Sequence, residues 1–152
     1  RDLHYPLRRQ RQMCIRDSLI TAPLSPNSKT WVLRLSNSIL RSTDPWLLHK
    51  SSNRDLYDAE RENLPDGIDE FIYLNERNEV CEGTITNIFV KIAGQWLTPP
   101  LSSGCLPGVL RRKKIEDASC KVKIITFSDL QGAEKITVGN ALRGEIEAVL
   151  SH

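Results

Sequence analysis

Turn-forming residues divide this chain into short segments. Pro99 and Pro100 lie close to Pro107 and Gly108, and residues 65–67 are Pro-Asp-Gly. Because proline and glycine end helices and strands, no long helix can run through these positions. No apolar stretch exceeds a handful of residues, which excludes a membrane-spanning helix. The chain is therefore expected to fold as a collection of short strands and short helices.

Alternation of apolar and polar residues in several of these segments predicts strands. The expected strands are 31–35, 71–74, 86–92, 95–98, 121–126, 134–138 and about 145–150. The polar run 36–45 is expected to end the first strand. The strands 71–74, 86–92 and 95–98 are expected to form a small antiparallel meander.

Helical spacing of apolar residues predicts a helix between Asn53 and Leu64, with Asn53 as its N-cap. A second helix is expected from Pro107 to about Ala118, and Ser128 is expected to open a short third one. This mixture predicts an α+β fold with a mainly antiparallel sheet and flanking helices.

Composition narrows the class of protein further. The 152 residues are enough for one domain with a real core, and 39% hydrophobic with 26% charged residues is within the globular range. The formal charge is +2, and residues 1–18 contain five arginines against two aspartates, so the rest of the chain is almost neutral. Such a chain lacks the basic field expected of a protein that binds nucleic acid or an anionic membrane.

The four cysteines are too far apart for a Cys-x-x-Cys pair, and only three histidines accompany them. This spacing fits neither a zinc site nor a small disulfide scaffold. We therefore expect free thiols in a reducing cytoplasm and no metal site.

Residues 1–18 differ from the rest of the chain. The run RQMCIRDSL at 11–19 looks like translated sequencing adapter, so 1–18 are expected to be a non-native or disordered leader. A transit peptide is the alternative, although this stretch has one serine and two aspartates. The Pro- and Ser-rich residues that follow predict a linker over 19–30.

Four segments carry a more specific signal: HKSSNRDLY at 49–57, LNERNEVCEGTITNIFV at 74–90, WLTPPLSSGCLPGVLR at 96–111 and VGNALRG at 138–144. In order and spacing they resemble the class IV, D-amino-acid-aminotransferase-like (fold type IV) family of pyridoxal phosphate enzymes. Within that family they are most similar to aminodeoxychorismate lyases. The resemblance implies that 31–152 form the large C-terminal domain and that the smaller N-terminal domain is missing, so the chain looks like a C-terminal fragment.

The resemblance assigns the two central roles to Lys50 and Glu82. A pyridoxal phosphate enzyme needs a lysine to which the cofactor is covalently attached, and that lysine matches Lys50. It also needs a carboxylate beside the ring nitrogen, and Glu82 in EGTITN matches that position. Without the resemblance, Lys50 would be taken as a surface lysine and Glu82 as a glutamate in an acidic stretch.

The resemblance places the cofactor phosphate at the residues Gly108, Val109 and Leu110. The start of a helix offers unpaired backbone N–H groups and a favourable dipole for an anion. A Pro-Gly turn before an amphipathic helix is the structural alternative, and the two are compatible. In the basic run 111–114, only Arg111 is expected to point inward.

The last motif implies further contacts at Asn140, Ala141 and Arg143. Asn140 and the amide of Ala141 match positions that contact the phosphate or the substrate carboxylate, and Arg143 is a candidate partner for that carboxylate. Asn140 as the cap of a strand end is the alternative. Arg54 and Tyr57 either buttress Lys50 or simply pack.

The resemblance thus implies a pyridoxal-phosphate-dependent lyase that converts 4-amino-4-deoxychorismate to 4-aminobenzoate and pyruvate for folate synthesis. A class IV aminotransferase acting on branched-chain or D-amino acids is the first alternative. A catalytically incomplete fragment that serves as an interaction domain is the second. A homodimer is expected by resemblance, and a synthase domain fused upstream is compatible with it.

Overall fold

The computed structural model describes residues 30–151, so the expectations for the leader 1–18 and for the linker up to residue 29 lie outside the described residues. The strands are β1 (Trp31–Leu40), β2 (Glu70–Asn75), β3 (Val80–Gly83), β4 (Asn87–Ile92), β5 (Gln95–Thr98), β6 (Lys121–Val122), β7 (Lys135–Asn140) and β8 (Gly144–Leu150). The helices are α2 (Asp55–Glu62), α3 (Val109–Glu116) and α4 (Phe127–Gln131), with 3-10 turns η2 (Pro45–Leu48) and η3 (Leu101–Ser103).

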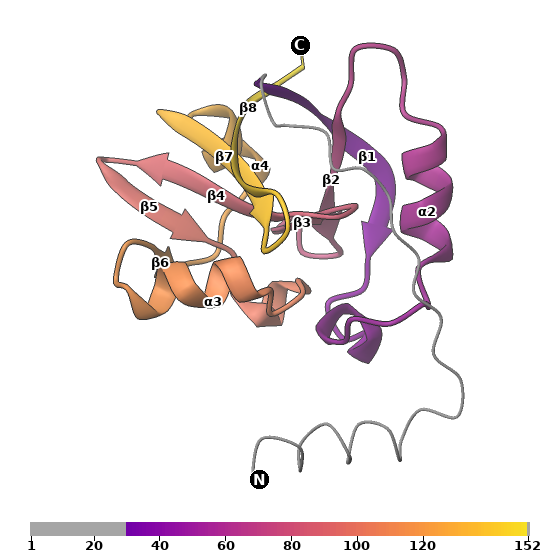
Figure 1. Cartoon of the computed structure of the whole chain (residues 1–152), viewed down its shortest axis with the longest axis horizontal. Helices are drawn as coiled ribbons and strands as arrows, with labels where there is room; N and C mark the ends of the chain where they lie inside the picture. Colours follow the sequence, from indigo (N-terminus) through magenta and orange to yellow (C-terminus); the bar gives the residue numbers. More distant parts are fainter. Residues whose placement is uncertain (1–29, 152) are drawn as a thin grey trace, which may run out of the picture.

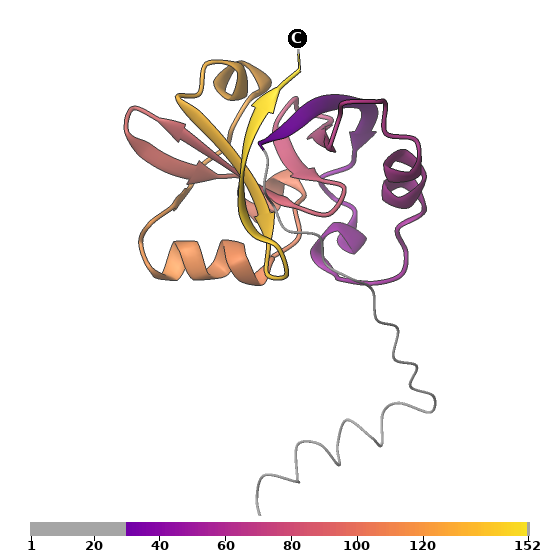
Figure 2. The same ribbon diagram turned by 45° about the horizontal axis from the view of Figure 1, so that its top comes forward.

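All eight strands join one sheet in the order β3-β2-β1-β8-β7-β4-β5-β6. Four of its pairs are antiparallel, and β1–β2, β1–β8 and β5–β6 are parallel. An antiparallel bridge between Glu79 and Thr126 and a 2.7 Å bond from the amide of Val80 to the carbonyl of Ile125 join the two ends of this order. The sheet is therefore curled on itself, with α2 and α3 outside it (Figures 1 and 2). The expected α+β fold with a mainly antiparallel sheet is confirmed.

The expected meander of β2, β4 and β5 is wrong in one respect. β4 and β5 pair as a hairpin, but β1, β8 and β7 lie between β2 and β4. The reason is that β1 and β2 are parallel, and parallel strands require a crossover, which α2 supplies. The hydrophobic pattern predicted each of the three elements and not the way they connect.

The first strand is longer than expected, because the polar run does not end it. β1 continues to Leu40, with a shift of register between Leu35 and Ile39. The hydroxyls of Ser36 and Ser38 donate hydrogen bonds of 2.9 and 2.6 Å to Oε1 of Glu60 on α2. A partner on another element thus lets two serines occupy a strand.

Smaller differences concern the ends of elements. Arg54, not Asn53, takes the N-cap position of α2, and it makes no side-chain cap bond there. Thr126, not Ser128, caps α4 through a capping box with Asp129. The strand expected at 121–126 is reduced to the two residues of β6, and β3 was not predicted at all. None of the helices in 30–151 is long and apolar enough to cross a membrane.

Two apolar clusters hold the fold together. The larger fills the inside of the curled sheet and includes the fully buried Leu33, Ile72 and Ile88. Each such side chain contributes roughly 1.5–3 kcal/mol by leaving water. The smaller cluster consists of Leu40, Leu47, Tyr73 and Cys81, with Tyr57 packed against it. It anchors η2 and α2 to β2 and β3, and so supports the residues described next.

Candidate active site

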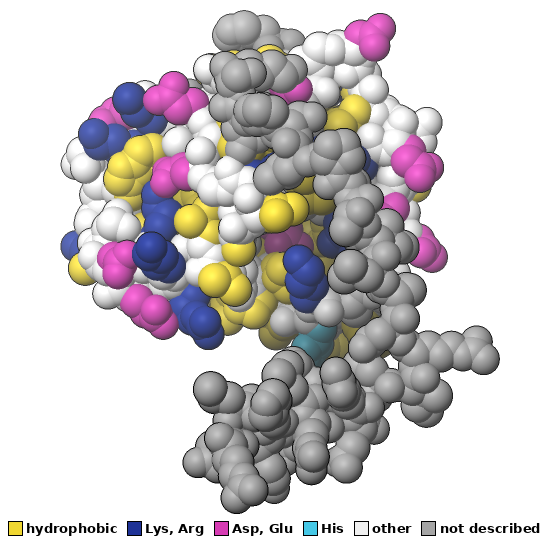
Figure 3. All heavy atoms as spheres, viewed as in Figure 1, with side chains coloured by type: hydrophobic (Ala, Val, Ile, Leu, Met, Phe, Trp, Pro, Cys, Tyr) yellow, Lys and Arg dark blue, Asp and Glu magenta, His cyan; other side chains and the backbone are white. Residues whose placement is uncertain are grey.

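A small cleft lies where η2, the start of α2, the end of β3 and the loop before α3 meet. Its lining includes two of the residues named by the sequence motifs, Lys50 and Glu82. Among residues 30–151, the lining consists of Trp46, Leu47, His49, Lys50, Asn53, Arg54, Tyr57, Glu82, Gly83, Thr84 and Leu106. The lining includes two cationic side chains, Lys50 and Arg54, and one carboxylate, Glu82, which makes the cleft suitable for an anionic ligand. Figure 3 shows basic side chains on either side of apolar surface on this face of the molecule.

Lys50 is held by the 3-10 turn that precedes it. The carboxylate of Asp44 accepts a 2.9 Å hydrogen bond from the amide of Trp46, and Leu47 buries its side chain in the smaller apolar cluster. Lys50 itself is exposed, and no residue in 30–151 contacts its amine through a hydrogen bond or ion pair. A lysine amine without a partner at a cleft is available for covalent attachment of a carbonyl ligand.

Glu82 is the buried acid of the cleft, with 8% of its surface exposed. Its Oε1 accepts a 2.9 Å hydrogen bond from the hydroxyl of Tyr57, and its Oε2 accepts a 2.7 Å bond from the amide of Leu106. Burial raises the pKa of Glu82 to about 7, against the opposing effect of these two bonds and of Arg54. A cationic N–H in the cleft would favour its ionised form. Such a carboxylate suits the protonated nitrogen of a pyridine ring.

Tyr57 and Arg54 secure Glu82 from the side of α2. The guanidinium of Arg54 lies 5.1 Å from the centre of the Tyr57 ring and donates a 2.6 Å hydrogen bond to the carbonyl of Thr84. Burial raises the pKa of the Tyr57 phenol, so this group stays protonated and remains a donor. The sequence left open whether Arg54 and Tyr57 buttress Lys50 or simply pack. Among residues 30–151, they contact each other, Thr84 and Glu82, and neither makes a hydrogen bond to Lys50.

Glu70 is a second buried carboxylate, whose role the sequence motifs did not indicate. It is fully buried and accepts hydrogen bonds from both the amide and the hydroxyl of Thr84, from the hydroxyl of Thr86 and from the amide of Ile85. Arg61 of α2 lies 3.6 Å away. These donors come from the 84–86 loop, which Glu70 thereby fixes directly after Glu82. In the sequence, only the two threonines of the 84–86 loop hint at such a partner.

The start of α3 stands beside the cleft. Gly108 is its N-cap without a side-chain cap bond, and the amides of Val109 and Leu110 open the helix. A Cβ at position 108 would collide with the side-chain oxygen of Asn87, so glycine is required there. The side-chain Nδ2 of Asn87 in turn donates a 2.9 Å hydrogen bond to the carbonyl of Leu106. The first amides of a helix have no intrahelical partner, so these can bind a phosphate.

The basic run that follows differs from the expectation. Arg111 is buried as expected, but it donates a 2.7 Å hydrogen bond to the carbonyl of Pro99 and supports the loop. Lys114 also packs inward, with its amine 4.7 Å from the centre of the Phe89 ring and 2.6 Å from a carboxylate oxygen of Glu145. The charge of Lys114 is neutralised by Glu145, which lies on β8, far away in the sequence. A local sequence pattern does not reveal such a partner.

The last motif lies in the turn between β7 and β8. Asn140 donates a 3.0 Å hydrogen bond to the carbonyl of Ile85, and its side-chain oxygen accepts from the amides of Leu142 and Arg143. Ala141 is exposed in the same turn, and the guanidinium of Arg143 lies 5.9 Å from the centre of the Trp31 ring. None of these three lines the Lys50–Glu82 cleft. Asn140 has the capping role that was its structural alternative, and the ligand contacts of the three stay predictions.

The residues present fit a pyridoxal phosphate group. An amine that has no hydrogen-bond or ion-pair partner within 30–151 and a buried carboxylate line one cleft, and Leu106 in its wall is two residues from the N-cap of α3. Lys50 would hold the aldehyde carbon, Glu82 the ring nitrogen, and the amides of Val109 and Leu110 the phosphate. Within 30–151, no group of three or more His, Cys, Asp and Glu side chains could hold a metal ion.

Known proteins with similar sequences and structures point the same way. A protein from Schizosaccharomyces pombe, provisionally named an aminodeoxychorismate lyase, is 28% identical over 114 residues, which are 70% of this chain and 49% of that protein. The structure is similar to one from Mesorhizobium loti, provisionally named an amino-acid aminotransferase, with 41% identity and a TM-score of 0.80. That similarity covers 86% of this chain and 65% of the other.

A third similarity shows the fold alone. The 4-amino-4-deoxychorismate lyase of Pseudomonas aeruginosa has a TM-score of 0.71 and 22% identity, over 80% of this chain and 48% of that one. This chain spans about half the length of the curated relative from S. pombe described above. Residues 9–149 match the amino-transferase class IV family, which comprises pyridoxal-phosphate-dependent lyases and aminotransferases. The chain therefore belongs to the class IV aminotransferase family.

Proposed function

We propose that this chain binds pyridoxal 5'-phosphate and carries the catalytic lysine of an aminodeoxychorismate lyase. The observation that carries the proposal is that Lys50 and Glu82, 32 positions apart in the sequence, line the same cleft beside the start of α3. The S. pombe relative, named as a lyase, supports the choice of reaction. The substrate is then 4-amino-4-deoxychorismate, and the products are 4-aminobenzoate and pyruvate.

Each residue has a task that follows from its surroundings. When bound, the cofactor supplies an electron sink for charge that develops at the substrate α-carbon. The Nζ of Lys50 would hold the cofactor and, as a free amine, would take the substrate α-proton and return a proton later. The carboxylate of Glu82 would accept a hydrogen bond from the protonated ring nitrogen. The amides of Val109 and Leu110 hold the phosphate.

The substrate carboxylates need cationic or amide partners. Arg143, Asn140 and the amide of Ala141 are proposed for them, and Arg54 already lines the cleft. The turn that carries the first three is tied to the 84–86 loop by the bond from Asn140 to Ile85. A homodimer in the cytoplasm remains part of the proposal.

A class IV aminotransferase is the second candidate, and the 41% identity to the M. loti protein favours it. Its substrates would be branched-chain or D-amino acids, and it would use the same lysine and acid. The difference lies in the fate of the amine, which an aminotransferase passes to a second keto acid.

A product assay separates these functions. The chain is incubated with pyridoxal phosphate and 4-amino-4-deoxychorismate, and 4-aminobenzoate and pyruvate are quantified, with Lys50→Ala as the inactive variant and Lys135→Ala as a matched surface control. Equal amounts of both products, lost only in Lys50→Ala, support the lyase. Amine transfer from an amino acid to 2-oxoglutarate without pyruvate from the lyase substrate supports the aminotransferase. No turnover of either, with cofactor bound, would identify a catalytically incomplete fragment.

A further inference from the structure

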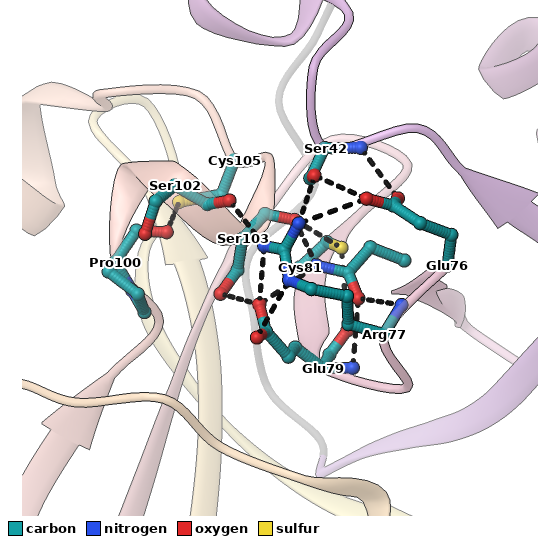
Figure 4. Close-up of polar contacts among 10 residues, drawn as sticks. Ser42, Glu76, Arg77, Glu79, Cys81, Pro100, Ser102, Ser103 and Cys105 are labelled. Atoms are coloured by element: carbon teal, nitrogen blue, oxygen red, sulfur yellow. Dashed lines mark hydrogen bonds and ion pairs between the residues drawn. The ribbon is translucent and has the colours of Figure 1, made fainter.

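A network of polar side chains stands behind the cleft, and its centre is Arg77 in the turn between β2 and β3. Arg77 is 45% exposed at its side chain and does not line the cleft. Its guanidinium nevertheless uses every N–H direction for a partner on this chain. Figure 4 shows it between residues of three segments that are distant in sequence.

The strongest contact of Arg77 is with Glu79 in the same turn. Nε and Nη2 of Arg77 donate hydrogen bonds of 3.0 and 2.9 Å to the two carboxylate oxygens of Glu79. This is the paired geometry that a guanidinium and a carboxylate favour. The bond from Arg77 holds the pKa of Glu79 at about 2, so the pair stays charged at neutral pH. Glu79 is three residues before Glu82 on the same hairpin.

The second contact reaches the segment that leads to Lys50. Nη1 of Arg77 donates to the hydroxyl of Ser42 and, over 2.9 Å, to Glu76. Glu76 also accepts a 2.8 Å hydrogen bond from the amide of Ser42. Ser42 lies between the end of β1 and η2, and η2 ends two residues before Lys50.

The third contact reaches the loop that leads to α3. Nη2 of Arg77 donates a 2.7 Å hydrogen bond to the carbonyl of Ser102. The neighbouring Ser103 is held by its hydroxyl bond of 2.7 Å to Glu79 and by a 2.9 Å bond from Asn75 to its carbonyl. Three residues later, the amide of Leu106 donates to Glu82. The loop is thus fixed at two points, one on the network and one in the cleft.

We propose that Arg77 is a positioning residue that sets the relative places of Lys50, Glu82 and the start of α3. The three segments that carry these groups meet in the side chain of Arg77 and its partner Glu79. The inference rests on the proposed function, because it assigns Arg77 a task in cofactor binding: one cofactor must reach an amine, an acid and a helix start at once. A rigid fork with five N–H groups can hold several segments together, and a lysine cannot.

The test compares Arg77→Met and Arg77→Lys with Arg112→Met in the full chain. Arg112 is a matched control, since its side chain is 70% exposed and, among the residues that the structure describes, makes no polar contact beyond an ion pair of 3.7 Å with Glu116 on α3. Two quantities are measured: the dissociation constant of pyridoxal phosphate by absorbance titration, and amide hydrogen exchange of residues 41–50 and 101–106. Loss of hydrogen bonds between charged groups predicts that both Arg77 variants raise the dissociation constant about tenfold or more and speed exchange in both segments. Arg112→Met should change neither by more than about twofold.

A further variant tests whether the effect is specific to one segment. Ser42→Ala removes the bonds of the Ser42 hydroxyl to Arg77 and Glu76 and leaves the contacts to the 101–106 loop in place, so exchange should rise in 41–50 and stay unchanged in 101–106. This result would also support the inference if the Arg77 variants did not fold. Unchanged cofactor affinity and exchange in Arg77→Met, or an equal rise everywhere in Ser42→Ala, would overturn it. If the unaltered chain binds no pyridoxal phosphate, the proposed function fails, and the exchange data alone decide the role of Arg77.

Discussion

Glu70 and Glu82 are both buried carboxylates, and they stand on the adjacent strands β2 and β3, but their surroundings differ. Glu70 is fully buried, is surrounded by donors from the 84–86 loop and has Arg61 3.6 Å away. Glu82 has two donors, one from Tyr57 and one from Leu106, and lines a cleft. Burial of an acid alone therefore does not mark a functional group. The free side of Glu82 does, because a ligand can approach it there.

The largest expected effect is on stability, from Glu70→Gln. The side-chain amide of glutamine would turn its own N–H groups toward the hydrogen-bond donors of the 84–86 loop, so some of these bonds could not form. The substitution also removes the carboxylate near Arg61. We expect the free energy of unfolding to fall by about 3–5 kcal/mol, as when one partner of a buried charged network is removed. Urea denaturation at neutral pH measures this. Glu82→Gln is the matched control and should not lower the free energy of unfolding at neutral pH, because the neutral amide replaces an acid whose ionised form is disfavoured by burial. Equal losses in the two variants would remove the contrast between the acids.

The next effect is on the pH dependence of stability. The folded pKa of Glu82, about 7, lies above the usual 4.5, so its protonated form favours the folded state. The contribution is complete below about pH 4.5 and is lost as pH rises to about 7. A shift of this size corresponds to about 3 kcal/mol. Without cofactor, the unaltered chain should lose roughly this much more stability over that window than Glu82→Gln does. Parallel pH curves for the two proteins would contradict the assignment.

Glu82→Gln should also lower cofactor function. A neutral amide does not keep the ring nitrogen protonated, so product formation should fall on the order of 100-fold, as for loss of one preorganised electrostatic partner. Steady-state kinetics with saturating pyridoxal phosphate measure this. Thr98→Val is a suitable control, because Thr98 is buried and, within the described part of the chain, its hydroxyl donates a hydrogen bond to the carbonyl of Ile88 and to no other group. Activity of Glu82→Gln near that of the unaltered chain would make Glu82 a structural acid like Glu70.

The smallest effect is expected from Tyr57→Phe. It removes one of the two donors of Glu82, which should raise the pKa of Glu82 further and weaken cofactor binding about fivefold, or about 1 kcal/mol. Tyr73→Phe is the matched control, since the Tyr73 ring packs edge-on against Tyr57 at 5.1 Å but its hydroxyl makes no hydrogen bond to Glu82 within residues 30–151. The midpoint of the pH curve of stability and the cofactor dissociation constant check this. An equal effect of both substitutions would show that Tyr57 acts only by packing.

The sequence predicted those parts of the fold that depend on residues close together in the chain, and missed those that depend on distant partners. The β4–β5 hairpin and the start of α3 depend on local turn residues such as Gly94 and Gly108, and both were predicted. The extension of β1 depends on Glu60, which accepts hydrogen bonds from two serines of the strand. Glu60 is more than 20 residues away from both of them in the sequence. No local pattern contains such a partner.

The candidate site divides in the same way. Resemblance named Lys50 and Glu82, and the structure places them in one cleft. It did not name Tyr57 as the donor to Glu82, nor Glu70 or Arg77, because their roles exist only where distant segments meet. Conversely, Arg143 was named for its chemistry, and its guanidinium lies over Trp31.

The most direct test of the central claim is to trap the cofactor. The chain is incubated with pyridoxal phosphate, reduced with borohydride, digested and mapped, beside Glu82→Gln and Lys50→Ala. We expect one labelled peptide, which carries the cofactor on Lys50. Its yield should be lower in Glu82→Gln, and the peptide should be absent in Lys50→Ala. Label spread over surface lysines, with the same pattern in all three proteins, would contradict the claim that Lys50 and Glu82 form one cofactor site.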